Sequence, residues 1–209
     1  SERVVNCSME LGGNAPFIVL EDADMAVAVD SAMVAKMRNA GESCIGANRF
    51  YVHHTRADEF SSSLAQAMST LVLGDGMKEG VDVGPLVNAS TINKVEQLVD
   101  QAVELGAKVL TGGSRVAGPG FFYQPTVLVN IPKHADILRE EIFGPVAPIV
   151  TFTSQEEVIA AANDTVFGLA AYVIGANVGN ALAVAEKLEA GVLGVNRGFI
   201  SDPAAPFGG

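Results

Sequence analysis

Short apolar runs rich in β-branched or aromatic residues alternate along this chain with longer segments of helical period. The runs predict strands at 15–20, 50–52, 108–110, 148–152, 169–174 and 192–195. The periodic segments predict helices from residue 25 to a stop at 39–41, and at 57–73, 90–106, 154–163 and 180–190. Because strands joined by crossover helices are typical of α/β proteins, we predict that class, in one domain.

Two of these helices carry recognisable end signals. A carboxylate run ending at Asp24 suits the N-terminus of the first helix, and Gly41 can adopt the left-handed conformation that ends it. Ser154 and Glu157 have the spacing of a capping box. The first helix has an apolar residue at every fourth position, which predicts its core-facing side: Val29, Met33 and Met37.

Composition narrows the class of protein. The chain has 209 residues, 49% of them hydrophobic and 18% charged, which is enough apolar material for a buried core. Its longest apolar runs are too short to cross a bilayer, so we expect no membrane association. A net charge of −11 argues against nucleic-acid partners, which are bound by neutralising phosphates.

The cysteines indicate the redox compartment of the protein, and the two ends of the chain indicate how much of it the sequence represents. Two cysteines, Cys7 and Cys44, cannot form a disulfide framework and fit a reducing compartment, so we expect a cytoplasmic protein. Ser1 is not an initiator Met and is not followed by a targeting signal, and the last residues lack any periodic pattern. We therefore expect the chain to be a segment of a longer protein.

Cys44 is the candidate nucleophile. The small or polar neighbours Gly41, Ser43 and Gly46 leave its sulfur unshielded, as a reactive thiol requires. The alternative is a cysteine that packs as a small hydrophobic residue. Cys7 has no comparable surroundings and we interpret it as incidental.

Other chemical groups are weaker candidates when taken alone. Glu10 and Glu141 both precede glycine-containing turns, where a carboxylate is usually solvated. His53 and His54 are adjacent on a predicted strand, so their side chains are expected on opposite faces. No further ligand completes a tetrahedral set around them, and we predict no metal site.

Four segments together resemble the aldehyde dehydrogenase superfamily, in order and in spacing. They are MELGGNAP at 9–16, NAGESC at 39–44, EEIFGPV at 140–146 and PFGG at 206–209. The resemblance covers essentially the whole chain. It implies a three-layer αβα sandwich with a mostly parallel sheet, an aldehyde as substrate and NAD or NADP as cofactor.

The resemblance also implies a role for each matched residue. Cys44 corresponds to the nucleophile, and its peptide N–H to one oxyanion donor. Glu10 corresponds to the general base, whose pKa partial burial would move toward neutrality. Glu141 and Phe143 correspond to residues that contact the nicotinamide ribose and its surroundings, with Gly12 beside them.

The superfamily's dinucleotide-binding domain lies mostly upstream of the matched region, and this chain has no glycine fingerprint for one. We therefore expect residues 1–209 to be the catalytic domain without the cofactor domain and without the C-terminal tail that helps subunits associate. Such a segment is expected to be inactive by itself in hydride transfer. The whole protein is expected to form a homodimer or a homotetramer.

Within the superfamily, the segments 11–19, 163–172 and 198–209 resemble succinate-semialdehyde dehydrogenases most. Arg38, six residues before the cysteine, corresponds to the residue that pairs with the substrate's distal carboxylate, and Ser201 to a serine that also contacts it. Arg38 could equally be a cation that complements the helix dipole. A solvated loop is the alternative for Ser201.

Two departures from that subfamily stand next to the cysteine. Gly46 replaces a second cysteine, so a redox disulfide is not expected, and Glu42 is expected to raise the pKa of the Cys44 thiol. Two alternatives therefore stay open: an aldehyde dehydrogenase of other substrate preference, and a non-catalytic scaffold that keeps the fold.

Overall fold

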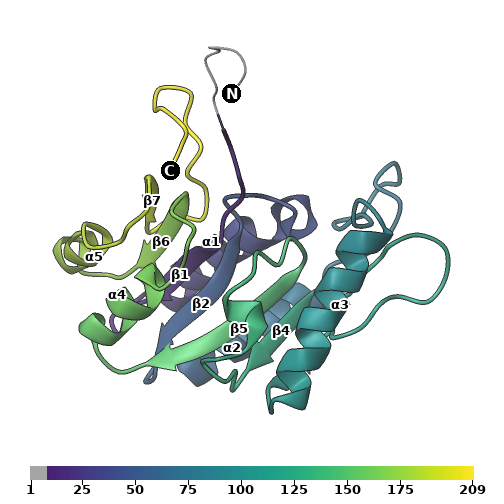
Figure 1. The fold of residues 1–209 in the computed structure, drawn as a ribbon, viewed down its shortest axis with the longest axis horizontal. Helices are drawn as coiled ribbons and strands as arrows, with labels where there is room; N and C mark the ends of the chain where they lie inside the picture. The colour runs from purple at the N-terminus through teal and green to yellow at the C-terminus, as the bar shows by residue number, and fades with distance from the viewer. Residues whose placement is uncertain (1–8) are drawn as a thin grey trace, which may run out of the picture.

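The strands lie in one seven-stranded sheet in the computed structural model, which describes residues 9–209 (Figure 1). They are β1 (Ala15–Val19), β2 (Ala47–His53), β3 (Lys108–Thr111), β4 (Thr126–Val129), β5 (Val146–Phe152), β6 (Ala170–Ile174) and β7 (Val192–Val195). The order across the sheet is β3-β4-β5-β2-β1-β6-β7, and every neighbouring pair is parallel except β3 and β4. The α/β class and the mostly parallel sheet are thereby confirmed.

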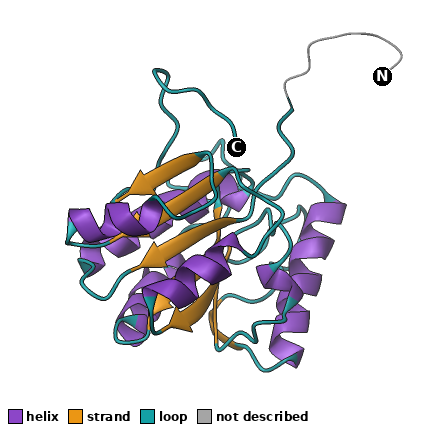
Figure 2. Ribbon diagram, turned by 60° about the vertical axis from the view of Figure 1, so that its left-hand side comes forward, coloured by secondary structure: helices purple, strands orange, loops and turns teal. Residues whose placement is uncertain are grey.

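Helices cover both faces of this sheet (Figure 2). They are α1 (Met25–Met37), α2 (Ala57–Ser69), α3 (Ala89–Glu104), α4 (Gln155–Asn163) and α5 (Val178–Ala185), with short 3₁₀ helices at Arg38–Gly41 and Asp136–Leu138. Within residues 9–209, none of them is long and apolar enough to span a membrane.

Alternate side chains of each central strand enter different cores. In β1, Phe17 and Val19 pack with residues of α1 and α2, whereas Ile18 packs with residues of α4 and α5. The residues of α3 form a further core with β4 and the start of β5. Because both faces are buried, most strand residues are apolar, which explains why the strands were visible in the sequence as continuous runs; buried Asn48 and Arg49 in β2 are exceptions.

Several predicted boundaries were wrong. The strand β4 was not predicted, and α5 ends at Ala185 instead of residue 190. The helix predicted to reach residue 73 ends at Ser69, because Val72 leaves the helix to exchange hydrogen bonds with the segment around Asp82. Local periodicity does not register such tertiary pairing, which overrides helix propensity.

The buried face of α1 also differs from the prediction. Val29, Met33 and Met37 are only half-buried, at the margin of the core. The buried face is instead made of small residues and one lysine: Ala28, Ser31, Ala32, Ala35 and Lys36. Small side chains let the segment after β7 come close, and the Gly198 backbone packs directly on the Ser31 carbonyl group.

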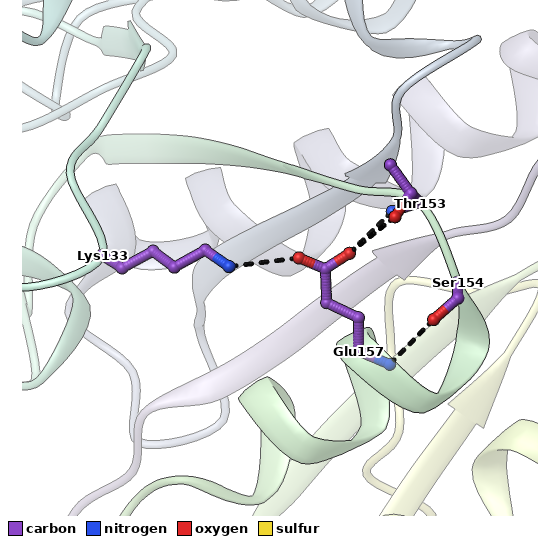
Figure 3. A network of polar contacts seen from close by, with 4 residues as sticks. All are labelled: Lys133, Thr153, Ser154 and Glu157. Atoms are coloured by element: carbon purple, nitrogen blue, oxygen red, sulfur yellow. Dashed lines mark hydrogen bonds and ion pairs between the residues drawn. The ribbon is translucent and has the colours of Figure 1, made fainter.

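The capping signals are confirmed, with one difference. The Asp24 carboxylate accepts a hydrogen bond from the Val27 N–H, and Ser154 Oγ accepts one from the Glu157 N–H. In a capping box, Glu157 would bond back to the N–H of Ser154. Its Oε2 accepts instead from both N–H and Oγ1–H of Thr153, and its Oε1 pairs with Lys133 Nζ at 3.1 Å (Figure 3).

We predict that Ser154→Ala lowers the free energy of unfolding by about 1 kcal/mol, because the substitution removes the N-cap acceptor of α4. Denaturant unfolding of the 209-residue chain measures this. Ser62→Ala, at an exposed position inside α2, is the control and is expected to be neutral or slightly stabilising. Equal destabilisation by the two substitutions would contradict the capping role.

Candidate active site

The predicted site residues gather at the amino ends of the central strands. Glu10 precedes β1, Cys44 precedes β2 and Glu141 precedes β5, and these three strands are mutually parallel neighbours. The start of β1 and the C-terminal segment lie together at this edge, at the top of Figure 1. Open α/β sheets usually bind ligands at the carboxyl ends of their strands. Here the candidate site lies at the opposite edge.

The chain reaches Cys44 through three consecutive residues in the left-handed region. Asn39, Ala40 and Gly41 have φ values of 53°, 54° and 80°. This conformation is free for glycine but costs roughly 1–2 kcal/mol for a residue such as Ala40. Asn39 offsets part of the cost, because its Nδ2 donates to the Glu42 carbonyl at 2.8 Å. Left-handed Gly41 confirms the predicted stop.

Cys44 occupies the second position of a tight turn. The turn is closed by a 2.9 Å hydrogen bond from the Gly46 N–H to the Ser43 carbonyl. A side chain at Gly46 would meet that same carbonyl, so the turn as built requires a glycine there. The Cys44 side chain is half-buried and carries a free thiol, whereas Cys7 lies outside the described residues.

The surroundings of Cys44 raise its pKa above the ordinary value of a thiol. Burial contributes most, followed by the negative charge of Glu10, while the charge of Glu141 adds a smaller effect in the same direction. Hydrogen bonding from the backbone N–H groups of Cys44 and Ile45 acts in the opposite direction. The charges of both predicted carboxylates thus act on the Cys44 thiol, and the two backbone N–H groups act against them.

Two expectations about acidic residues were wrong. Glu42 is not among the groups that raise the pKa of Cys44, because its Oε1 turns away and accepts from the Val87 N–H at 3.0 Å. Glu10 is exposed in this structure, so the partial burial expected for a general base is not present.

Close backbone packing joins the segment that carries Glu10 to the segments that carry Cys44 and Glu141. The Cys44 carbonyl lies directly against Gly13 Cα, where a side chain would clash. Gly13 N–H donates to Glu141 Oε1 at 3.0 Å, and Glu141 Oε2 lies 2.9 Å from the position that a Cβ on Gly12 would take. Gly12 has a φ of 102°, in the range that favours glycine. The two glycines therefore hold the Glu141 carboxylate beside the cysteine turn.

Glu141, Phe143 and Gly12 were predicted to contact the cofactor; this role stays a prediction, and the structure places the Glu141 carboxylate beside Gly12. The half-buried Glu141 carboxylate keeps unused acceptor capacity for ribose hydroxyls. Phe143 is held in the left-handed region at φ 55°, a strained conformation of the kind that clusters at ligand sites. These three residues would form only the nicotinamide end of a cofactor site.

Arg38 and the segment that carries Ser201 meet at the same edge. The Arg38 guanidinium lies 4.7 Å from the centre of the Phe199 ring, and Ser201, two residues further on, is half-buried. Arg38 is exposed and lies just past the last residue of α1, so it can complement the helix dipole and also face a ligand.

Tyr172 was not predicted and lies beneath the cysteine turn. Its hydroxyl donates to the Ile45 carbonyl at 2.7 Å. Burial raises the pKa of Tyr172, while the charge of Arg38 acts to lower it and that of Cys44 to raise it. No local pattern distinguishes Tyr172 from any other aromatic residue on a buried strand.

Lys36 was also missed. Its side chain is fully buried, and its Nζ donates to Asn48 Oδ1 at 2.9 Å and to the Gly144 carbonyl at 3.2 Å. Burial lowers the pKa of Lys36 to about 7, although the charge of Glu141 acts to raise it. The available signal was its spacing, four residues after Ala32 and eight after Ala28, because this places the lysine on the small-residue face of α1.

The two adjacent histidines are arranged differently from the expectation. His54 lies beyond the end of β2, so its ring packs beside that of His53 with centroids 4.6 Å apart. Among the described residues, no cluster of three or more His, Cys, Asp or Glu side chains could hold a metal ion.

Comparison with known proteins assigns the family. The model of the aldehyde dehydrogenase family matches residues 1–209. This chain belongs to the aldehyde dehydrogenase family. It is 52% identical over its full length to a succinate-semialdehyde dehydrogenase of Paenarthrobacter nicotinovorans, covering 46% of that protein. It is 48% identical to a glutarate-semialdehyde dehydrogenase of Pseudomonas putida, covering 43% of it.

A solved structure agrees with the fold. The crystal structure of succinate-semialdehyde dehydrogenase from Burkholderia pseudomallei superposes with a TM-score of 0.94 at 47% identity, over 96% of this chain and 42% of that one. The three-layer arrangement is thereby confirmed as an aldehyde dehydrogenase fold. The chain spans less than half the length of the relatives it matches.

We predict that Glu10→Gln shifts the pH midpoint of Cys44 alkylation downward, because it removes a negative charge that disfavours the thiolate. The measurement is the rate of iodoacetamide labelling against pH, in a Cys7→Ser background so that Cys44 is the only thiol. Glu42→Gln is the control and is expected to leave the midpoint unchanged, since Glu42 faces Val87. A larger shift in the Glu42 variant would overturn this view of the site.

Proposed function

We propose that residues 1–209 are the catalytic domain of an NAD(P)-dependent aldehyde dehydrogenase that oxidises an aldehyde carrying a distal anionic group, with succinate semialdehyde as the preferred substrate. The observation that supports this most is the convergence of the three loops that carry Glu10, Cys44 and Glu141, joined by the packing of the Cys44 carbonyl on Gly13 and by the hydrogen bond from Gly13 to Glu141. The sequence relatives named for semialdehydes of dicarboxylic acids support the substrate class.

In this proposal the chemistry begins at the Cys44 sulfur. The thiolate attacks the aldehyde carbon, and the carbonyl oxygen becomes an oxyanion that the Cys44 N–H can stabilise. Glu141, Phe143 and Gly12 would hold the nicotinamide end of NAD or NADP, which would supply the acceptor for the hydride that leaves this carbon. The product on the protein is a thioester on Cys44.

The second half of the reaction needs a base and a water molecule. Glu10 takes a proton from water as the water attacks the thioester carbon, the C–S bond breaks, and the carboxylate product leaves. The exposed position of Glu10 gives it access to solvent water. The surrounding surface in the complete protein would then decide how far this carboxylate is desolvated.

Arg38 and Ser201 are proposed to bind the distal carboxylate of the substrate. An anion approaching a chain of net charge −11 needs a local cation, and a guanidinium can hold a carboxylate through two parallel hydrogen bonds. Stacking on Phe199 fixes the plane of the Arg38 guanidinium without using its N–H donors. The donors therefore remain free to point at a ligand.

We predict that the 209-residue chain releases p-nitrophenolate from p-nitrophenyl acetate without any cofactor, because acyl transfer needs only the nucleophile and the base. A rapid burst followed by slow turnover is expected in stopped-flow absorbance. Cys44→Ser should abolish the burst, and Glu10→Gln should retain the burst and slow the turnover by about 100-fold, a common contribution of a general base. Turnover unaffected by Cys44→Ser would contradict the proposal and favour the scaffold alternative.

We predict that succinate semialdehyde protects Cys44 from iodoacetamide at lower concentration than butanal does, because Arg38 adds an attraction for the carboxylate. Arg38→Gln should raise the protecting concentration of succinate semialdehyde about fivefold, the effect of about 1 kcal/mol, and leave that of butanal unchanged. Arg115→Gln, whose arginine pairs with Glu96 on the α3 surface, is the matched control. Equal weakening for both aldehydes would exclude the carboxylate role.

A further inference from the structure

A buried polar pair lies behind the cysteine turn and belongs to none of the roles assigned above. Lys36 on α1 and Asn48 on β2 are 0% and 1% exposed, and Lys36 Nζ donates to Asn48 Oδ1. We call these two residues the buried clamp. A lysine is almost never fully buried without a partner, so its contacts need an explanation.

The buried clamp connects the three loops of the site. Lys36 Nζ also donates to the Gly144 carbonyl, in the loop that carries Glu141. Asn48 Nδ2 donates to the Gly13 carbonyl at 3.4 Å, in the segment that carries Glu10. The clamp itself sits on the two elements that flank the cysteine turn, since α1 ends before the turn and β2 begins after it.

Two further contacts join the same loops directly to one another. The Gly13 N–H donates to Glu141 Oε1, and the Gly41 backbone packs against the Gly144 carbonyl that Lys36 binds. The Glu141 loop is thus held at its carboxylate by Gly13 and at Gly144 by Lys36. Removing the lysine would free one of these two attachments and leave the buried Asn48 Oδ1 without a donor, whereas the Gly144 carbonyl would keep only the Val146 N–H.

The donor count of the amine fits this connecting role. Lys36 Nζ has two hydrogen-bond acceptors, both uncharged, and among residues 9–209 no carboxylate lies within ion-pair distance of it. A neutral amine has two N–H groups, one for each acceptor. The low pKa that burial gives Lys36 agrees with this form of the side chain.

We propose that Lys36 is a positioning residue that, through Gly144 and Asn48, sets the placement of the Glu141 carboxylate relative to the Cys44 sulfur. This inference deepens the proposed function and rests on it for its meaning, because Glu141 is there the residue that receives the cofactor. Lys36 itself touches neither substrate nor cofactor.

The test measures the coupling between Glu141 and Cys44 with and without the lysine. In the Cys7→Ser chain, Glu141→Gln should lower the pH midpoint of Cys44 alkylation, since the Glu141 charge disfavours the thiolate. In a Lys36→Met background the same substitution should produce less than half of that shift, because the loop has lost its attachment at Gly144. A purely structural lysine would change stability and leave the shift intact.

The control and a second variant keep the test decisive. Lys133→Met removes an exposed lysine whose amine pairs with Glu157, away from the site, and should leave the Glu141 shift unchanged (Figure 3). If Lys36→Met does not fold, as judged by circular dichroism, Asn48→Ala takes its place and should also reduce the shift, because it removes the bond to Gly13 and one acceptor of Lys36.

The outcomes separate this inference from the proposed function. A folded Lys36→Met or Asn48→Ala chain that keeps the full Glu141 shift overturns the positioning role. Failure of the proposed function would appear elsewhere, as ester cleavage that does not depend on Cys44. The coupling experiment needs no cofactor and no aldehyde, so its result stands whichever way the activity measurements fall.

Discussion

The site depends on close approach between backbones at the amino edge of the sheet. The Cys44 carbonyl lies against Gly13 Cα, and the Gly144 carbonyl lies against Gly41 Cα, at distances that no side chain could occupy. These two contacts bring the loops before β1, β2 and β5 together. The proximity of Glu10, Glu141 and Cys44 follows from them, because each of these residues lies within three positions of one of the contacts.

The site lies at the amino edge of the sheet, and this location determines which residues position its chemical groups. Loops at the carboxyl edge of a parallel sheet follow its strands. The loops of this site instead lead into the strands, which are buried on both faces. The cysteine turn is fixed from behind by Tyr172, whose hydroxyl donates to the Ile45 carbonyl, and Asn48, the second residue of β2, donates to the Gly13 carbonyl beside it. Ala40 keeps its left-handed conformation because the surrounding contacts fix the path of the chain at this point.

Sequence reasoning identified what local patterns encode and missed what only tertiary contact creates. Continuous apolar runs gave most of the sheet, and four ordered motifs located Cys44, Glu10 and Glu141 together. Lys36 was missed because a lysine in a helix is normally solvated, and only its burial among small residues distinguishes it. Glu42 was misjudged because proximity in sequence was taken for proximity of charge, whereas its carboxylate faces Val87.

The electrostatics of Cys44 involve a conflict between the two halves of the proposed reaction. Attack requires a thiolate, which the charges of Glu10 and Glu141 disfavour, while release of the product requires Glu10 as an ionised base. The N–H groups of Cys44 and Ile45 partly relieve the conflict, since they stabilise negative charge on sulfur without neutralising either carboxylate. A side-chain cation beside the thiol would favour the thiolate more strongly, but it would also pair with Glu10 and weaken it as a base. Backbone donors favour the thiolate and leave Glu10 free to accept a proton, which accounts for a nucleophile placed in a turn instead of next to a lysine.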